Sequence, residues 1–462
     1  MTRKFINRKE ELKALEKLKK RKLRSAVIYG RRRVGKTTLI KKFLENKKSL
    51  YFLCSRRKIK YNLRKFSEKV CRFLGTPEIE FKNFFDAFRA LSSKKGVIVA
   101  VDEFGYLIER DEGILSDFQE IVDEIKDFKL VLCGSAVSLM ESRILGYKSP
   151  LYGRVDLQLR VKPLLFEHIF EWFEGISFED AVKLYGTTHN VPKYLEFFEA
   201  KNVESEIINN FFDISSFLYN DAINILSEEL RDYATYFQVL EAISLGYTKI
   251  TEIANYSYIQ PKDVSYYLKT LEKLDIVERR VPLFSKRKEK KGIYIIKDNY
   301  FNFWFRFVSP FQSDIESYAS EQPILNFKNN FNQYLGFIFE DLILDLIKRK
   351  KVDLGLDFTK IGKQWGRIPG RKETYEIDIV ALNERTKEIL FAECKWRSRV
   401  NAEKICKELV EKAEHVEWHR GRRKEILAVF AKSFSKRIDE FEDRKVFCFD
   451  LRDLKRKLNL NS

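Results

Sequence analysis

The sequence has few of the residues that cross-link small domains or bind metals. Its 462 residues include four histidines and six cysteines, at positions 54, 71, 133, 394, 406 and 448. No two cysteines form a C-x-x-C pair, so neither a disulfide framework nor a zinc knuckle is indicated. His415 and His419 could bind zinc from one helix face, but their order is not H-E-x-x-H. A solvated, charged helix is the better interpretation.

Long apolar runs are also absent. The chain has no stretch of about 18 uninterrupted apolar residues, and residues 1–18 read as a charged amphipathic helix rather than a signal peptide. We therefore expect a cytoplasmic protein with no membrane partner. The 44% hydrophobic content, with 39 phenylalanines and 21 tyrosines, excludes a disordered chain. The length suits about three domains.

Acidic residues are fewer than basic residues. Lysine and arginine number 87 against 68 aspartates and glutamates, which gives a net charge of +19. Such an excess favours contact with a polyanion, and DNA is the expected partner. A lysine-rich proteome or the surface of a thermophilic protein would give the same excess. Composition alone leaves both interpretations open.

A glycine-rich loop near the N-terminus carries the strongest motif. It joins a short apolar strand at residues 25–29 to a helical run at residues 38–44. The spacing is G-x-x-x-x-G-K-[ST], in which backbone N–H groups and a helix N-terminus surround phosphates. We expect Lys36 to neutralise phosphate oxygens and Thr37 to place its hydroxyl on Mg²⁺, so ATP and Mg²⁺ are the predicted cofactors. The predicted nucleotide-binding residues are Gly30, Arg31, Arg32, Arg33, Val34, Gly35, Lys36, Thr37 and Thr38.

A second apolar strand ends in two acids. Residues 97–101 form an unbroken apolar run typical of a central parallel strand, and Asp102 and Glu103 follow it. We expect Asp102 to hold the Mg²⁺ shell. Glu103 is placed to polarise the attacking water as a general base, which would make the protein an ATPase.

Two further apolar runs, at residues 49–53 and 129–133, fit the same sheet. The N-terminal fold class is therefore an α/β P-loop NTPase with a parallel sheet and helices on both faces. Ser135 follows the last of these strands. It either contacts the γ-phosphate or the water, or it is a turn residue.

Six motifs then occur in order along the chain: FINRKEELKALEKL, AVIYGRRRVGKTTLI, VIVAVDEFGYL, LCGSAVSLM, SPLYGRVDLQLRVKPL and NVPKYLE. Together they resemble the archaeal ATPases of the AAA+-related class that includes the STAND signalling NTPases. The resemblance implies that Glu103 is the catalytic acid of an ATPase with an additional strand between its Walker strands. It also implies that Arg154 is an arginine finger, acting within the chain or on a neighbouring copy in a homo-oligomer. By residue type alone, a salt-bridged surface arginine fits Arg154 equally well.

One segment departs from that family. Before Pro192 the family usually carries a Gly-Gly pair, whereas this chain has His189, Asn190 and Val191. The resemblance implies that this segment senses the nucleotide state, and the departure weakens the expected coupling. We interpret His189 as a loop residue rather than a ligand.

The middle of the chain predicts a winged helix. From residue 226 to about residue 274 the pattern is helical with a break at Gly246, and a strand follows at residues 276–279. The expected wing, residues 285–292, carries five cations: Lys286, Arg287, Lys288, Lys290 and Lys291. On a DNA duplex they would contact phosphates and give salt-sensitive binding. A solvated hairpin on a protein spacer is the alternative.

Residues 292–307 combine a strand with a dense aromatic cluster. Such rings can stack on bases, but they more often pack two domains together, which agrees with the family resemblance. We place a domain boundary near residue 310. The expected domains are a P-loop ATPase domain with a helical extension at residues 1–200, a helical and winged-helix domain at residues 201–310, and a third domain at residues 311–462.

The third domain contains a second candidate active site. Residues 375–382 alternate like a strand, and residues 388–396 form another strand after a charged turn. The hairpin brings Asp378 near Glu393, and Lys395 shares a face with Glu393 because strand side chains alternate. The two carboxylates can bind Mg²⁺ or Mn²⁺, while the lysine holds the attacking water or the phosphate.

This pattern resembles the PD-(D/E)xK nucleases, which have a restriction-endonuclease-like α/β core. The resemblance matches Asp378 to the first metal-binding aspartate, Glu393 and Lys395 to the E-x-K half, and Glu340 to the helical glutamate. Ile377 replaces the proline before the first aspartate. An inactive domain whose acids are salt-bridged to cations is the alternative. Two functions stay open: an ATP-regulated enzyme that acts on DNA, and a STAND-like switch that scaffolds partners.

Overall fold

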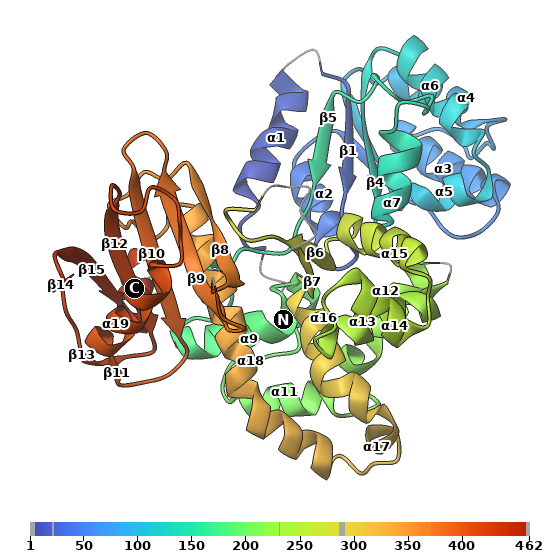
Figure 1. The fold of residues 1–462 in the computed structure, drawn as a ribbon. Helices are drawn as coiled ribbons and strands as arrows, with labels where there is room; N and C mark the ends of the chain where they lie inside the picture. Colours follow the sequence, from blue (N-terminus) through green and yellow to red (C-terminus); the bar gives the residue numbers. More distant parts are fainter. Residues whose placement is uncertain (1–4, 21–22, 231, 286–291, 369, 459–462) are drawn as a thin grey trace. The chain divides into compact units, whose positions relative to one another are not determined.

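The computed structural model describes residues 5–20, 23–230, 232–285, 292–368 and 370–458. The chain divides into two compact units, each with its own sheet (Figure 1). The first unit comprises Met1–Leu164 and Val191–Tyr194, and the second comprises Leu165–Asn190 and Leu195–Ser462. The division into three domains at residues 200 and 310 stays a prediction.

The first unit contains a five-stranded parallel sheet in the order β2-β3-β4-β1-β5. Its strands are β1 Ser25–Tyr29, β2 Ser49–Leu53, β3 Val97–Asp102, β4 Phe128–Gly134 and β5 Leu157–Arg160. β4 lies between β1 and β3, so the additional strand implied by the family resemblance is present. Because all five strands run in parallel, the loops that follow β1, β3 and β4 meet at one edge of the sheet.

Helices cover both faces of this sheet, which is why β3 is buried along its whole length. On one face α1 and α2 pack against Ile28 and Val131. On the other face α3, α4 and α6 pack against Val99 and Leu132. The helices of this unit are α1 Lys9–Lys20, α2 Lys36–Leu44, α3 Ile59–Leu74, α4 Phe84–Ser92, α5 Gly105–Arg110, α6 Ile114–Glu124 and α7 Val137–Leu139.

Helices also form the first part of the second unit. They are α8 His168–Trp172, α9 Phe178–Thr188, α11 Val203–Phe211, α12 Phe217–Glu229, α13 Tyr233–Ser244, α14 Ile250–Ser257, α15 Pro261–Lys273, α16 Asn299–Phe303, α17 Gln312–Glu316 and α18 Glu321–Lys348, while α10, Pro192–Leu195, begins in the first unit. His189 follows α9 in a left-handed conformation with φ of 50°, so it lies outside the helix as expected.

The order of elements from α13 onward follows the sequence expectation. After α15 come two antiparallel strands, β6 Val277–Arg280 and β7 Ile293–Ile296. α15 begins at Pro261, because the proline ring fixes φ at a value that suits the first turn of a helix. The expected wing cations at residues 286–291 lie outside the described residues.

The aromatic cluster is part of the interior of the second unit. Tyr300, Phe303 and Trp304 are fully buried. Phe303 packs edge-on against Phe327 and Phe331 of α18. Rings buried in this way cannot stack on bases, so the cluster serves packing.

A six-stranded mixed sheet, in the order β14-β15-β12-β10-β9-β8, forms the C-terminal part of the second unit (Figure 1). β8, β9 and β10 are antiparallel neighbours, whereas β10, β12 and β15 run in parallel. On one face Ile405 and Leu409 of α19 pack with Phe391. The elements are β8 Lys360–Arg367, β9 Thr374–Asn383, β10 Glu388–Lys395, β11 Val400–Asn401, α19 Ala402–Ala413, β12 Lys424–Ala431, β13 Phe434–Lys436, β14 Glu440–Phe441, β15 Arg444–Phe449 and α20 Leu451–Lys457.

The prediction of a helix through His415 and His419 is wrong. α19 ends at Ala413, and both histidines lie in turns. The guanidinium of Arg423 donates hydrogen bonds to the carbonyl oxygens of Ala413 and Val416. It thereby satisfies acceptors at the helix end and favours the turn that follows.

Candidate functional site

The glycine-rich loop between β1 and α2, residues 30–37, requires glycine at two positions. A Cβ atom at Gly30 would lie 2.2 Å from the carbonyl oxygen of Val161, so no larger residue fits there. Gly35 precedes α2 with φ of 91°, a conformation that other residues rarely adopt. The loop therefore ends at the N-terminus of a helix, where backbone N–H groups favour phosphate. We call this loop the P-loop.

Lys36 is the first residue of α2 and is 5% exposed. Its ammonium donates hydrogen bonds to the carbonyl oxygens of Gly30 and Arg31, at 2.6 and 2.9 Å. The charge of Lys36 is therefore held against the backbone of the P-loop. This is the position from which a lysine reaches the phosphates of a nucleotide.

Thr37 and Asp102 meet as the sequence predicted. The Thr37 hydroxyl donates a hydrogen bond of 2.7 Å to Oδ2 of Asp102, which is fully buried at the end of β3. A hydroxyl and a carboxylate are the hard oxygen donors that Mg²⁺ prefers. The two residues therefore fit a magnesium shell beside the P-loop.

Tyr51 of β2 is a further residue of this site that the sequence motifs did not indicate. Its hydroxyl lies 2.7 Å from Oδ2 of Asp102, the oxygen that also accepts from Thr37. Burial, and then the adjacent Asp102 carboxylate, raises the pKa of Tyr51 well above its usual value, so the phenol remains a donor. Two hydroxyl groups thus fix the orientation of the carboxylate.

Glu103 follows Asp102 in a left-handed backbone conformation, with φ of 53°. Its carboxylate accepts a hydrogen bond of 2.7 Å from the hydroxyl of Ser135, which follows β4. A non-glycine residue with positive φ is uncommon and turns its side chain out of the strand direction. Ser135 therefore positions Glu103, a contact that the sequence alternatives for this serine did not include.

Val191–Tyr194 belongs to the first unit and contacts the P-loop. The guanidinium of Arg31 donates to the hydroxyl of Tyr194 at 3.1 Å. The backbone N–H of Lys193 donates to the carbonyl oxygen of Arg33 at 3.4 Å. Lys193 and Tyr194, directly after Pro192, thus lie against the nucleotide loop.

Arg8 also supports the P-loop. It is 6% exposed, and its guanidinium donates to the carbonyl oxygens of Val34 and Lys162, at 2.8 and 2.7 Å. It thereby joins the N-terminal segment, the P-loop and the segment after β5. The motif FINRKEEL contains Arg8, but nothing in its pattern indicated this contact.

The structure does not bring Arg154 to the P-loop of its own chain. Its guanidinium pairs with Asp123 at 2.8 Å, and its carbonyl oxygen accepts a hydrogen bond from the hydroxyl of Ser25. Ser25 begins β1, whereas the P-loop follows Tyr29 at the other end, roughly 13 Å away at the usual rise of a strand. The arginine-finger role stays a prediction that concerns a neighbouring copy.

Asp378 and Glu393 meet across β9 and β10 in the second unit. The paired register of these antiparallel strands ends with Ala392 opposite Ile379, and Glu393 and Asp378 are the next residues along each strand. The N–H of Cys394 donates to Asp378 at 2.8 Å. Asp378 is 8% exposed and Glu393 is 5% exposed. Burial, and then the carboxylates of Glu393 and Glu340, raises the pKa of Asp378 to about 8.

Lysine side chains accompany these acids. Lys395 and Lys412 both donate to Oε1 of Glu393, at 2.7 and 2.9 Å. Oε2 of Glu393 is buried and has no hydrogen-bond partner within the described part of the chain. Burial would lower the pKa of Lys395, but the Glu393 carboxylate raises it, so the ammonium stays charged.

Glu340 on α18 is paired with a different lysine. Nζ of Lys363 lies 2.6 Å from its carboxylate, and burial raises the pKa of Glu340. Among the described residues, no three acidic, histidine or cysteine side chains are grouped closely enough to hold a metal ion. The predicted ligands fit a divalent cation only in part: Asp378 and Glu393 are adjacent, and Glu393 has an oxygen to offer, but Glu340 does not complete the set.

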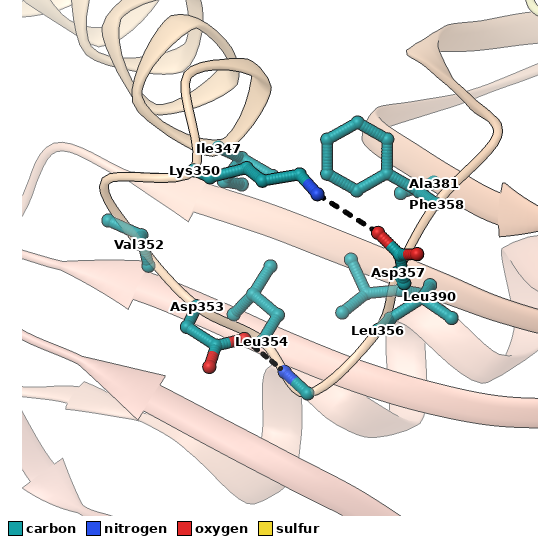
Figure 2. Close-up of a pocket in the computed structure, with 11 residues that line it drawn as sticks. Ile347, Lys350, Val352, Asp353, Leu354, Leu356, Asp357, Phe358, Ala381 and Leu390 are labelled. Atoms are coloured by element: carbon teal, nitrogen blue, oxygen red, sulfur yellow. Dashed lines mark hydrogen bonds and ion pairs between the residues drawn. The ribbon is translucent and has the colours of Figure 1, made fainter.

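A cavity of about 490 Å³ lies on the face of the C-terminal sheet opposite to α19. Figure 2 shows the residues that line it. Lys350 and Asp357 form an ion pair of 3.0 Å beside it. It includes none of the predicted site residues, and no sequence motif indicated it. Its lining residues are Ile347, Lys350, Val352, Asp353, Leu354, Gly355, Leu356, Asp357, Phe358, Ala381 and Leu390.

The hydroxyl of Tyr51 gives a direct test of the nucleotide site. Tyr51→Phe removes one of the two donors that orient Asp102, while the ring remains in place. We expect turnover to fall about tenfold, which corresponds to roughly 1.4 kcal/mol, with little change in ATP affinity. Phosphate release and nucleotide titration measure the two effects. Tyr152→Phe, at a tyrosine that is 56% exposed, is the matched control; equal turnover in both variants would contradict the role of Tyr51.

Two parts of the chain match known protein families. Residues 5–198 match a family of ATPase domains that occur predominantly in Archaea, and residues 304–406 match a family of archaeal and bacterial proteins of unknown function. Over 428 residues the chain is 37% identical to an uncharacterised protein of Methanocaldococcus jannaschii, which covers 89% of this chain and 92% of the relative. Over 45 residues it is 67% identical to an uncharacterised ATP-binding protein of the same organism. This match covers 10% of this chain and 76% of that protein.

A solved structure gives the same fold. The Walker-type ATPase of Pyrococcus abyssi matches with a TM-score of 0.52 and 22% sequence identity, over 65% of this chain and 96% of that chain. None of the described helices combines the length and the apolar content that crossing a membrane would need. The parallel sheet of the first unit is thus a P-loop ATPase fold, and the C-terminal mixed sheet accompanies it.

Proposed function

The chain belongs to the archaeal family of P-loop ATPases, and on that premise we propose that it is an ATP-regulated enzyme that cleaves DNA with a divalent cation. ATP binding and hydrolysis follow from the family, and the cleavage is our proposal. The observation that carries it is the buried meeting of Asp378 and Glu393 across β9 and β10, with Lys395 on the same strand. Incubation of the protein with supercoiled, linear and branched DNA, in Mg²⁺ or Mn²⁺ and with or without ATP, tests it.

In the ATPase half, each residue has a separate task. Lys36 would leave the carbonyl oxygens that it now contacts and bind phosphate oxygens. Thr37 and Asp102 would hold Mg²⁺, which neutralises charge on the phosphates when it is bound. Glu103, oriented by Ser135, would accept a proton from the attacking water.

A short segment supports the proposal that ATP regulates the rest of the chain. Val191–Tyr194 contacts the P-loop, and the residues on both sides of it belong to the second unit. A nucleotide that moves Arg31 would also move its hydrogen bond to Tyr194. We propose that this segment reports the nucleotide state to the second unit through the chain itself.

The DNA part of the proposal rests on α13, α14, α15, β6 and β7, which we interpret as a winged helix. A three-residue turn separates α14 from α15, as in helix-turn-helix pairs. Lys262, Tyr266, Lys269 and Lys273 follow one another at helical spacing on the exposed face of α15. Lysines on such a face attract phosphates, and the second helix of this motif is the one that enters the major groove.

Neutralising this face should weaken binding to DNA of any sequence. We expect Lys262→Gln with Lys269→Gln to lower duplex affinity and to reduce the slope of log affinity against log salt by about 0.9 for each phosphate that the protein no longer neutralises. Fluorescence anisotropy over a salt series measures both quantities. Lys94→Gln with Lys95→Gln, at exposed positions of the first unit, changes net charge equally and serves as the control. If both pairs give the same small loss, α15 is not the DNA-binding face.

In the nuclease half, the chain would supply oxygen ligands and one fixed charge. Asp378 and Glu393 would bind a divalent cation, which activates water and neutralises the phosphate. Lys395 would stabilise the charge that develops on the phosphate oxygens. The unpartnered Oε2 of Glu393 supports this assignment, because a buried carboxylate oxygen without a partner is costly.

One observation favours a second candidate function, a STAND-like switch that binds ATP and scaffolds partners. Glu393 and Glu340 are already neutralised by lysines, as the acids of an inactive domain would be. Such a protein would bind ATP and change its oligomeric state without cutting DNA. Light scattering with and without ATP, beside the cleavage assay, separates the two candidates.

A further inference from the structure

Lys363 of β8 lies between two acids of α18. Its ammonium is 2.6 Å from Oε2 of Glu340 and 3.4 Å from Oδ1 of Asp341, and its side chain is 10% exposed. Burial would lower the pKa of Lys363, but Asp341 and then Glu340 raise it, so the ammonium stays charged. A buried lysine in this position holds Glu340 firmly, because a buried acid without a cation would be costly.

The second acid, Asp341, forms an ion pair with a residue of β6, a strand far away in the sequence. The guanidinium of Arg280, at the end of β6, donates two hydrogen bonds to Asp341, at 2.9 and 2.8 Å. The N–H of Leu283, just beyond β6, donates to the carbonyl oxygen of Lys363 at 3.0 Å. Arg280 and Leu283 are therefore bound to the same two elements, α18 and β8, that fix Glu340.

These contacts divide the acids of the C-terminal site between two sets of cations. Glu340 and Asp341 share Lys363 and Arg280, while Glu393 shares Lys395 and Lys412. A divalent cation would therefore compete with these lysines for the same carboxylate groups. The pairing of Glu340 with Lys363 thus explains why the three predicted ligands do not form one group.

We propose that Lys363 is a latch that withholds Glu340 from the divalent-cation site, and that Arg280 connects this latch to the β6–β7 strand pair. This inference rests on the proposed nuclease function and adds its regulation. With Arg280 in place, its guanidinium neutralises Asp341, and Lys363 stays closer to Glu340 than to Asp341. When Arg280 leaves Asp341, that acid can take Lys363, and Glu340 becomes free to bind the cation. A ligand that pulls on the strand pair, such as a DNA duplex bound by the winged helix, would open the latch.

The latch is tested by Mn²⁺ binding in the full-length chain, without ATP, in an Asp102→Asn background that removes the carboxylate of the metal site beside the P-loop. Isothermal titration calorimetry gives the affinity, and thermal melting gives an independent shift on adding Mn²⁺. We expect Lys363→Met to bind Mn²⁺ about tenfold more tightly than the background protein, because the competing ammonium is gone. Lys360→Gln is the matched control, since Lys360 lies on the same strand but pairs with the exposed Glu384.

A double-mutant comparison identifies Glu340 as the residue released. Glu340→Gln alone should change the Mn²⁺ affinity by less than about twofold, because the latch already withholds this acid, but it should cancel the gain from Lys363→Met. If Glu340 were a permanent ligand, the single change would weaken binding strongly. Arg280→Gln leaves Lys363 intact and should also tighten binding, which keeps the test valid if Lys363→Met does not fold.

The outcomes separate the latch from the nuclease site itself. If the background protein binds Mn²⁺ and neither Lys363→Met nor Arg280→Gln binds it more tightly, the latch is refuted while the metal site stands. If no variant binds Mn²⁺, both ideas fall. Weak or absent binding in the background protein with clear binding in Lys363→Met supports the latch.

Discussion

Lys36→Ala is expected to abolish ATP binding, whereas Glu103→Gln is expected to bind ATP normally and to stop turnover. Lys36 holds its ammonium against two carbonyl oxygens of the P-loop, where it would meet the phosphates, and its loss should lower the affinity by more than about a hundredfold. Glu103 lies beyond the phosphate-binding loop and would act on the water alone, so its loss should lower the turnover rate by roughly 10²–10⁴-fold. Titration with a fluorescent nucleotide and a phosphate-release assay measure these effects separately.

The control for Lys36 lies on the same helix. Lys42 of α2 pairs with Glu45 at the surface, so Lys42→Ala removes a lysine without touching the P-loop. Its ATP affinity should equal that of the wild type. Equal affinity of the wild type and Lys36→Ala would overturn the assignment of the loop, and normal turnover in Glu103→Gln would assign the water to another group.

DNA cleavage is expected to disappear in Asp378→Ala and in Lys395→Ala, while ATP hydrolysis survives in both. Asp378 would lose an oxygen ligand, and Lys395 the charge that faces the phosphate, so each change should cost a factor of about 100 or more. The P-loop lies in the other compact unit, with its own sheet and core, so these changes should leave it intact. Gel analysis of DNA products and phosphate release give the two readouts from one preparation.

Glu388→Gln provides the control for the acid on the same hairpin. Glu388 begins β10, at the far end from Glu393, and pairs with Lys424. Its cleavage rate should match that of the wild type. A wild type that cuts none of the DNA forms, or an Asp378→Ala variant that cuts as fast, would make the scaffold function the better interpretation.

The nucleotide site was largely predictable because its residues follow one another along the chain. A P-loop is one continuous strand, loop and helix, and Asp102 ends a strand whose unbroken apolar run predicts its central position. The predicted bounds of β1 and β2 agree with the structure. The one expectation about strand order, an additional strand between the Walker strands, came from the family resemblance, since no local pattern tells which strands become neighbours.

The residues that the sequence did not indicate act across large separations. Tyr51 reaches Asp102 from another strand, and Arg8 reaches Val34 and the chain after β5. A tyrosine in a strand or an arginine before a helix is common in any protein. Only the folded sheet makes these contacts visible.

The acids Asp378, Glu393 and Glu340 were predictable from the sequence only in part. The predicted hairpin placed Asp378 near Glu393, and the structure brings them together on neighbouring strands. The sequence pattern could not predict that Lys363 would hold Glu340, because that contact depends on how α18 packs beside β8. In a chain with 87 lysines and arginines, which cation pairs with which acid is decided by tertiary packing rather than by spacing.

The segment Val191–Tyr194 has a consequence for the order in which the protein is made. Its contact partners, Arg31 and Arg33, are synthesised about 160 residues earlier than it is, and the whole of α9 lies in between. A fragment that stops at Leu164 contains every strand of the first sheet, yet it lacks Lys193 and Tyr194, which contact the P-loop. During translation the P-loop therefore lacks these contacts until residue 194 has left the ribosome, by which time the second unit has begun to emerge.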